Sequence, residues 1–328
     1  MQTATSDLNV LGQPRIRSRF DTTTTAAEVV EGLDLTGKRA LVTGGGGGIG
    51  VEIARALASA GAEVLIADIA LEAAQGVADA LNADYSGSRV SAKRLDLASL
   101  GTVRGFAADL VAAEAPLDIL INNAGVMAPP LTRTTEGHEL QFGINFLGHY
   151  VLTRGLMPLL RAESGARVVS VSSIGHRRSR IQWDDPDYRT RDYDRWEAYG
   201  QSKTACALFA VALTDHHARD GVTCNTMNPG GSMTGLQRFL TPEELRAQGW
   251  IDADGKVLSR WRSPAQCAAT SVWLATAPEL AGIGGRYFED CTEAAPHDPA
   301  IPMKGLHAYA LDAGDAERLW QLAEAMTA

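Results

Sequence analysis

Short apolar segments alternate with helical segments along most of the chain, and this alternation restricts the possible folds more than any other feature of the sequence. Six apolar segments have the length and composition of strands: residues 39–43, 63–67, 90–95, 117–121, 167–172 and 222–227. The segments between them carry apolar residues at helical spacing: residues 49–60, 71–82, 100–114, 135–161 and 198–218. Continuously apolar strands are typical of a parallel sheet buried on both faces. The sequence therefore predicts an α/β fold, a single doubly wound parallel sheet with helices on both faces.

The two ends of the chain lie outside this alternation. We expect residues 1–32 to form an N-terminal arm with a short helix, and residues 33–290 to form the sheet-containing domain. Residues 291–328 form a C-terminal extension, whose final helix has an apolar stripe that packs on the same domain.

Composition excludes several classes of protein. The formal net charge of −9 argues against a nucleic-acid-binding protein, which normally carries a basic surplus. No run approaches the roughly 18–20 apolar residues of a membrane span, and the first residues lack an apolar leader, so we expect a cytoplasmic protein. The four cysteines are far apart and no metal-binding spacing occurs, so neither disulfides nor a metal site is expected.

A run of glycines joins the first strand to the following helix. Gly44, Gly48 and Gly50 fit the pattern T-G-x-x-x-G-x-G, and the run also fits G-x-G-x-x-G. Glycines between a strand and a helix let backbone N–H groups approach a pyrophosphate, which the helix N-terminus also attracts. This position favours a dinucleotide-binding turn of the Rossmann type; the alternative is a flexible hinge.

An acidic residue follows the second strand. Asp68 lies about 20 residues beyond Gly48, the spacing of a carboxylate that binds the adenosine ribose diol and repels a 2′-phosphate. No Arg or Lys occurs in the glycine turn or immediately after Asp68, so the sequence predicts NAD as the cofactor. The alternative for Asp68 is a capping residue for the helix at 71–82.

Tyr199 and Lys203 are four residues apart in a helical segment, and this spacing places them on one helix face. A phenol is a weak acid, and a neighbouring ammonium favours its phenolate form, so the pair is suited to proton transfer with a hydroxyl or carbonyl. Without further motifs, a solvated helix face would explain the same spacing.

Further motifs occur in a fixed order with this pair. They are Thr43-Gly44-x-x-x-Gly48-x-Gly50, Asn122-Asn123-Ala124-Gly125, Asn145, Ser173, Tyr199-x-x-x-Lys203 and Asn228-Pro229-Gly230. Over residues 33–288 the set resembles the short-chain dehydrogenase/reductase family. The leader at 24–38, the segment 145–149, the long interval between Ser173 and Tyr199 and the extended tail are similar to retinol dehydrogenases and WW-domain oxidoreductases.

The resemblance implies catalytic roles for four residues. Tyr199 would be the general acid/base, and Lys203 would favour its phenolate and bind the nicotinamide ribose. Ser173 would hydrogen-bond the substrate oxygen, and Asn145 would bend its helix and hold a water that connects Lys203 to solvent.

The resemblance also implies a set of cofactor-binding residues besides Tyr199 and Lys203. Asp96 would contact the adenine, and the Pro229–Gly230 turn with Thr234 would bind the nicotinamide carboxamide. The full set is Gly44, Gly48, Ile49, Gly50, Asp68, Asp96, Leu97, Asn123, Ala124, Gly125, Pro229, Gly230 and Thr234.

Two departures from the family pattern bear on the cofactor. The glycine turn lacks the Asn, Ser or Arg commonly found between Gly44 and Gly48. Retinol-type members often carry a basic residue where this chain has Asp68, so the cofactor preference differs from theirs. Residues 176–195 lengthen the interval between Ser173 and Tyr199, either as a solvated excursion or as a lip over the substrate pocket.

The sequence therefore predicts an NAD-dependent oxidoreductase acting on the CH–OH group of a hydrophobic secondary alcohol or ketone, assembled as a homodimer or homotetramer. A substrate lid is expected at about residues 230–260, with these apolar side chains: Met233, Leu236, Phe239, Leu240 and Trp250. The alternatives are an NADPH-dependent carbonyl reductase and a non-catalytic dinucleotide-binding sensor or scaffold.

Overall fold

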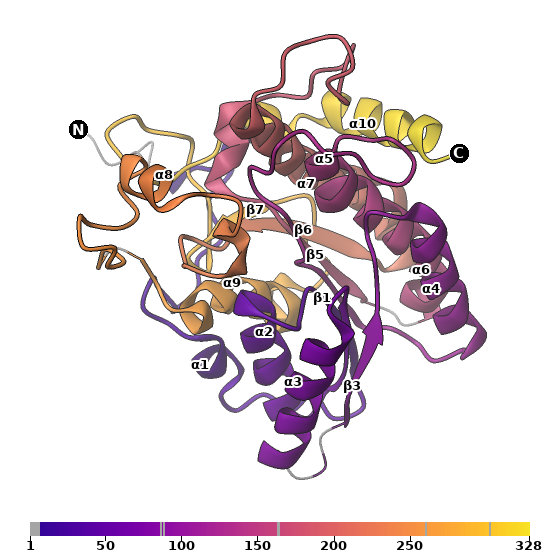
Figure 1. Cartoon of the computed structure of the whole chain (residues 1–328). Helices are drawn as coiled ribbons and strands as arrows, with labels where there is room; N and C mark the ends of the chain where they lie inside the picture. The colour runs from indigo at the N-terminus through magenta and orange to yellow at the C-terminus, as the bar shows by residue number, and fades with distance from the viewer. Residues whose placement is uncertain (1–6, 86, 88, 163–164, 260, 302) are drawn as a thin grey trace.

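A single, mostly parallel sheet organises the chain in the computed structural model (Figure 1), which describes residues 7–328 except 86, 88, 163–164, 260 and 302. Among these residues the sheet has eight strands in the order β3-β2-β1-β4-β5-β6-β7-β8. The strands are β1 Arg39–Thr43, β2 Glu63–Asp68, β3 Arg89–Arg94, β4 Ile119–Asn122, β5 Arg167–Val171, β6 Thr223–Asn228, β7 Tyr287–Glu289 and β8 Thr292–Glu293. Only β8 is antiparallel to its neighbour. The predicted α/β fold with one parallel sheet is confirmed.

Helices cover both faces of the sheet because residues along each strand alternate between two hydrophobic cores. In β1, Leu41 belongs to one core, whereas Ala40 and Val42 belong to the other. The first core includes α4 Leu100–Ala112, α6 His149–Ala162, α7 Arg195–His217 and α10 Ala313–Met326. The second includes α1 Ala26–Val30, α2 Gly48–Ser59, α3 Leu71–Asp84 and α9 Pro264–Thr276.

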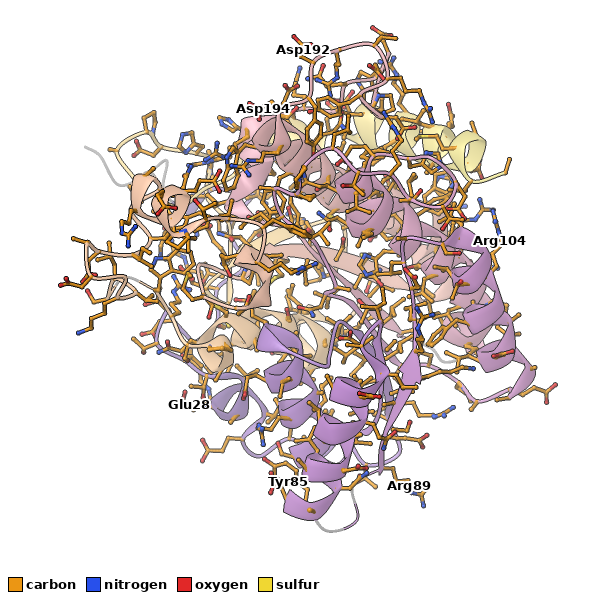
Figure 2. All side chains as sticks on the ribbon, viewed as in Figure 1. Glu28, Tyr85, Arg89, Arg104, Asp192 and Asp194 are labelled. Carbon is orange, nitrogen blue, oxygen red and sulfur yellow. The ribbon has the colours of Figure 1, made fainter. Side chains whose placement is uncertain are left out.

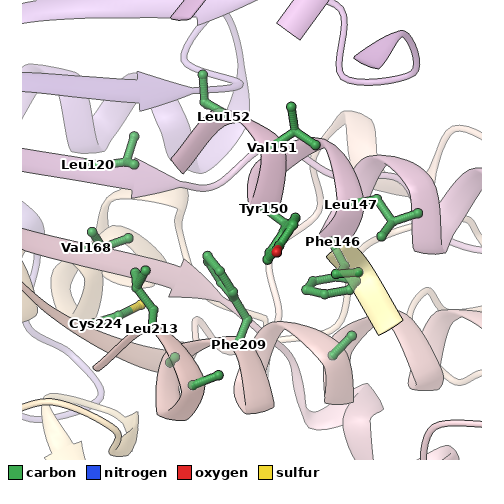
Figure 3. Packing of buried hydrophobic residues seen from close by; sticks show 14 of the residues in the cluster. Leu120, Phe146, Leu147, Tyr150, Val151, Leu152, Val168, Phe209, Leu213 and Cys224 are labelled. Carbon is green, nitrogen blue, oxygen red and sulfur yellow. The ribbon is translucent and has the colours of Figure 1, made fainter. Parts of the chain in front are cut away.

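The first core is dominated by aromatic side chains between α6, α7 and α10. Tyr150 and Phe209 face each other from α6 and α7, with the centres of their rings 6.0 Å apart (Figure 3). Trp320 of α10 closes the cluster at 5.1 Å from the Tyr150 ring, nearly perpendicular to it. Edge-to-face aromatic contacts of this kind add specific geometry to the burial of apolar area, so α10 is fixed on the domain.

The N-terminal segment is attached to the antiparallel end of the sheet. Glu293 in β8 accepts hydrogen bonds from the Asn9 side chain at 2.6 Å and from the Ile16 N–H at 3.0 Å. The Ser18 hydroxyl donates to the carbonyl of Cys291 at 2.7 Å. These contacts connect residues about 275 positions apart in the sequence, and they cover the edge of the sheet.

The prediction of one continuous helix at residues 135–161 is wrong. The chain first makes a turn in which Gly137 has φ +87°, and Glu139 then caps the short helix α5 Leu140–Phe142. Residues Gly143–Gly148 form a π-helical turn before α6 begins at His149. The interruption was hidden because a π-turn keeps helical dihedral angles and the apolar periodicity changes little across it.

No described helix is both long enough and apolar enough to cross a membrane. The longest, α7, has 23 residues and contains Tyr199 and Lys203.

Candidate active site

The carboxyl ends of the parallel strands border a cleft of about 1350 Å³. The strand order reverses between β1 and β4, and such a switch point is where doubly wound sheets bind ligands. Of the residues predicted for the site, all but Gly50 and Asn145 line this cleft. Residues from seven segments of the chain therefore meet at one edge of the sheet.

Two glycines of the glycine turn have left-handed backbone conformations. Gly44 and Gly48 have φ of +68° and +56°, a region that favours glycine. A Cβ on Gly50 would lie 2.1 Å from the carbonyl oxygen of Gly44, so Gly50 allows α2 to pack against the strand although it does not line the cleft. No side chain caps α2 and no acidic residue occurs in its first turn, so its first N–H groups remain available to an anion.

Asp68 lies at the carboxyl end of β2 and lines the cleft. Its carboxylate accepts the N–H of Gly46 and the N–H of Ala70, both at 2.9 Å. The alternative assignment of Asp68 as the cap of α3 is wrong, because the N-cap is Ala70 and its helix has no side-chain cap. Asp68 instead joins the glycine turn to the segment after β2.

Thr43 connects the glycine turn to the neighbouring strand and to α6. Its hydroxyl oxygen accepts the N–H groups of Asn123 and Ala124 at 2.9 and 3.0 Å, and it lies 2.9 Å from Nε2 of His149. The Asn123 amide donates to the carbonyl of Thr43 at 2.9 Å. These bonds hold the ends of β1 and β4 together beside the cleft.

His149 is a buried residue of this network that the sequence analysis missed. Burial lowers the pKa of His149 to about 4, so the ring is neutral near pH 7. Its Nδ1 lies 3.1 Å from the carbonyl oxygen of Asn145, which can only accept; Nδ1 therefore carries the proton and Nε2 accepts from the Thr43 hydroxyl. The only sequence signal was a histidine four residues after Asn145.

A pH dependence of stability follows from this burial. The folded-state pKa of His149, about 4, lies below the value near 6.5 of an unfolded histidine, so the unfolded state takes up the proton first as the pH falls. The free energy of unfolding should therefore decrease between pH 6.5 and 4, by about 1.4 kcal/mol per pH unit from this residue. Urea unfolding of the wild type and of His149→Gln across this range tests it, and curves with the same slope would contradict it.

Tyr199 and Lys203 lie on the cleft-facing side of α7, which begins after the capping residue Asp194. The Lys203 ammonium donates to the carbonyl of Val171 at 2.9 Å and lies 5.8 Å from the centre of the Tyr199 ring. Asp194, labelled below Asp192 in the upper part of Figure 2, holds the first turn by accepting the N–H groups of Trp196 and Glu197. The predicted pairing of Tyr199 with Lys203 on one helix face is therefore present, with the ammonium fixed by the end of β5.

Gly175, which the sequence analysis did not single out, lies between Ser173 and the ring of Tyr199. The Ser173 hydroxyl oxygen accepts the N–H of Gly175 at 3.0 Å. A Cβ on Gly175 would lie 2.6 Å from a carbon of the Tyr199 ring and 3.4 Å from the Ser173 oxygen. The missing side chain at Gly175 thus lets the serine and the tyrosine lie close together.

Asn145 lies inside the π-helical turn, and its side-chain amide and backbone carbonyl have protein partners. Its side chain bonds the N–H and the carbonyl of Val126 at 2.8 and 3.0 Å and donates to the Ser202 hydroxyl at 2.9 Å. Its backbone carbonyl accepts from His149 and from the Cys206 thiol. Asn145 therefore connects the segment after β4 to α7 next to Lys203.

Part of the predicted lid lies beside Tyr199 at the cleft. Leu236 and Trp250 line the cleft, as predicted, and they pack with Met127 and Tyr199. Three other predicted lid residues do not line it: Met233, Phe239 and Leu240. Leu240 instead packs in the same apolar cluster as Met127 and Tyr199.

Two further segments reach this end of the cleft. Arg177 and Arg178 line the cleft, so the start of the 176–195 segment forms a lip at this end. The later part of the segment is held by Arg133, which donates to the carbonyls of Asp187 and Tyr188. The C-terminal extension contributes His297, Met303 and His307. The sequence analysis missed these three because a proline-rich tail carries no motif that places it over a site.

Comparison with known proteins shows the family to which the chain belongs. The short chain dehydrogenase family matches residues 38–245. A protein named "Probable oxidoreductase" from Streptomyces lividans is 46% identical over 88% of this chain and 97% of its own length. Human retinol dehydrogenase 13 is 37% identical over 80% of this chain and 79% of its own length, which confirms the resemblance to retinol dehydrogenases.

Solved structures give the same result. An uncharacterized protein from Mycobacterium paratuberculosis is 30% identical, with a TM-score of 0.70 over 93% of this chain and 97% of its own. The NADP complex of RhlG from Pseudomonas aeruginosa is 29% identical, with a TM-score of 0.58 over 76% of this chain and 94% of its own. The chain therefore belongs to the short-chain dehydrogenase family of oxidoreductases that bind a nicotinamide dinucleotide.

Proposed function

We propose that the chain is an NAD-dependent oxidoreductase that interconverts a hydrophobic secondary alcohol and the corresponding ketone. The observation that carries the proposal is the meeting of Ser173, Tyr199 and Lys203 in the same cleft as the glycine turn and Asp68. The apolar residues over Tyr199, among them Met127 and Trp250, support a hydrophobic substrate.

The residues of the glycine turn fit a dinucleotide. Side chains at Gly44 or Gly48 would fill the cradle, since a Cβ there would lie 2.8 Å from Ala124 and 3.1 Å from Thr234. The uncapped N-terminus of α2 would bind the pyrophosphate, and Asp68 would accept the hydroxyls of the adenosine ribose. The remaining cofactor contacts proposed from the sequence, except Gly50, also line the cleft. When bound, the nicotinamide ring accepts or supplies a hydride.

The protein's own residues would handle the proton. Tyr199 would take the substrate hydroxyl proton on its phenolic oxygen during oxidation and return it during reduction. Lys203, held by Val171, would stabilise the negative charge that forms on that oxygen. Since the Ser173 oxygen accepts the Gly175 N–H, its own O–H is available to donate to the substrate oxygen. Asn145 would position α7, and with it Lys203, through Ser202.

An activity screen of the purified chain tests this proposal. We expect secondary alcohols to be oxidised with NAD, and ketones to be reduced with NADH, faster than with the phosphorylated cofactors. Primary alcohols are the matched comparison. The absence of turnover with any alcohol or ketone in either direction would contradict the enzymatic assignment.

Cofactor preference is tested separately at Asp68. A 2′-phosphate would meet this carboxylate as a like charge, so Asp68→Ala should lower the wild-type preference for NAD over NADP by roughly ten- to hundredfold in kcat/KM. Asp79→Ala, an exposed carboxylate on α3 outside the cleft, is the matched control. A wild-type preference for NADP would refute the NAD assignment.

An NADPH-dependent carbonyl reductase is the second candidate. The observation in its favour is the structural similarity to the NADP complex of RhlG. The two candidates share every proposed catalytic residue, and the Asp68 experiment separates them.

A further inference from the structure

Three tryptophans pack edge to face beside the part of the cleft that contains Tyr199, and two of them line it. Trp196 comes from α7, whereas Trp250 and Trp261 come from the lid segment and the residues that follow it. Trp250 lies edge to face against Trp196 of α7, with ring centres 6.1 Å apart, and against Trp261 at 5.2 Å. Trp250 and Trp261 line the cleft. Trp196 and Trp250 also pack in the apolar cluster that contains Tyr199. We call these three residues the tryptophan wall.

The tryptophan wall begins beside the turn proposed to bind the nicotinamide end of the cofactor. A Cβ on Gly231 would lie 3.1 Å from the Trp261 ring, and the Arg262 N–H donates to the Gly231 carbonyl at 2.9 Å. The indole Nε1 of Trp261 is buried and has no hydrogen-bond partner among the described residues. Rigid aromatic faces contact flat rings with little loss of conformational freedom, so the wall favours a planar ligand over a flexible aliphatic chain.

An arginine stands at the other end of the tryptophan wall. The guanidinium of Arg178 lies 4.9 Å from the centre of the Trp196 ring, and Arg178 lines the cleft. A Cβ on Gly200, the residue after Tyr199, would come within 2.8 Å of the Arg178 Cβ, so the arginine stem packs directly on α7 near the catalytic tyrosine. Within the described part of the chain, no carboxylate forms an ion pair with Arg178.

Other charged groups that line the cleft have protein partners among the described residues. Arg238, on the lid, donates to the carbonyl of Gly235 at 2.9 Å. Asp290 forms ion pairs with both Arg262 and Lys304. Arg177 donates to His297 and to the carbonyl of Lys304. Glu289 is buried and accepts the N–H of Gly305, and this burial raises its pKa. None of these contacts supplies the counter-charge for Arg178.

We propose that the substrate has an aromatic or polycyclic ring that carries a carboxylate. The ring packs against the tryptophan wall, and the carboxylate binds the guanidinium of Arg178, so Arg178 determines specificity at the rim of the site. The proposal rests on the function proposed above, because it identifies the substrate class of the same cleft.

The size of the expected preference for the free acid over its methyl ester, and the dependence of this preference on salt, follow from the exposure of Arg178. An exposed guanidinium–carboxylate pair contributes modestly, so a free acid should bind about fivefold more tightly than its uncharged methyl ester. Salt screens such a pair, and high salt should remove most of the preference. Contacts with the tryptophan wall are apolar and should not weaken with salt.

Binding of naphthoate and of methyl naphthoate to the full chain loaded with cofactor tests the proposal. Dissociation constants are measured by calorimetry for the wild type, Arg178→Gln and Arg180→Gln. Arg180 is the matched control, because it is an exposed arginine of the same segment that lies over Tyr309 and does not line the cleft. We expect the preference for the acid in the wild type and in Arg180→Gln, and its loss in Arg178→Gln with unchanged affinity for the ester.

Three results would overturn the proposal: equal binding of acid and ester by the wild type, an unchanged preference in Arg178→Gln, or weakened cofactor binding as the only effect of that variant. Trp250→Leu should weaken both compounds about equally, and unchanged binding of both would refute the tryptophan wall as the ring site. Reduction of acetylnaphthoate and its methyl ester is measured in parallel. If the wild type prefers the acid in binding but reduces neither ketone, the proposed function fails and the binding proposal stands. If acetylnaphthoate and its methyl ester are reduced with equal kcat/KM, the proposed function stands and the binding proposal fails.

Discussion

Replacing Tyr199 by phenylalanine should lower kcat by about 10²–10⁴-fold, the usual loss when a general acid/base is removed. The substitution removes one oxygen and leaves the ring in its contact with Gly175. In the described part of the chain the Tyr199 hydroxyl has no protein hydrogen-bond partner, although the residue is buried. Folding and cofactor affinity should therefore survive while turnover is lost.

Steady-state rates, cofactor dissociation constants and the thermal midpoint of the variant separate these quantities. Tyr85→Phe is the matched control, because Tyr85 ends α3 at the bottom of Figure 2, far from the cleft. It should retain the wild-type rate. A Tyr199→Phe enzyme with unchanged kcat would exclude the phenol as the proton carrier.

Replacing Gly50 by alanine should weaken cofactor binding by at least a hundredfold and lower the thermal midpoint. Alanine normally stabilises a helix relative to glycine by about 1 kcal/mol. At Gly50, however, the new Cβ would lie 2.1 Å from the Gly44 carbonyl and 2.9 Å from the Asn123 amide. The backbone of the turn must move to relieve these contacts, and the cradle beside it changes shape.

The matched control is Gly105→Ala in the middle of α4, where the added Cβ would meet no atom within 4 Å. This variant should be as stable as the wild type or more stable by about 0.5–1 kcal/mol, with unchanged cofactor affinity. Calorimetric titration with the cofactor and thermal unfolding measure both quantities. If Gly50→Ala binds the cofactor as tightly as the wild type, α2 does not need this close approach.

The sequence was sufficient for features that depend on neighbouring residues or on periodicity. Continuously apolar strands between helices predicted the parallel sheet, because both faces of such strands must be buried. The glycine turn and the Tyr199–Lys203 pair were predictable for the same reason, since each lies within a few residues along one strand–turn–helix or one helix face.

Other features came from contacts between segments far apart in the sequence. The helix predicted at 135–161 begins only at Leu140, because Gly137 turns the chain and Glu139 caps the new start. His149 became a neutral link between Thr43 and Asn145 only through its burial between β1 and the π-turn. The sequence around Glu139 and His149 carries no local signal for the roles that these two residues have in the fold.

The sequence by itself predicted the sheet, the glycine turn and the placement of Tyr199 and Lys203 on one helix face, because local spacing and hydrophobic periodicity encode all three. The proposed catalytic roles came from the resemblance to the family. Only the tertiary structure decided what surrounds the substrate. Trp261 and Arg178 reach one cleft from segments more than 80 residues apart, and His307 reaches it from the C-terminal extension. The placement of these residues depends on how the lid, the lip and the C-terminal extension pack on the sheet-containing domain. The free energy of this packing comes from contacts between residues far apart in the sequence, and local sequence patterns do not predict such contacts.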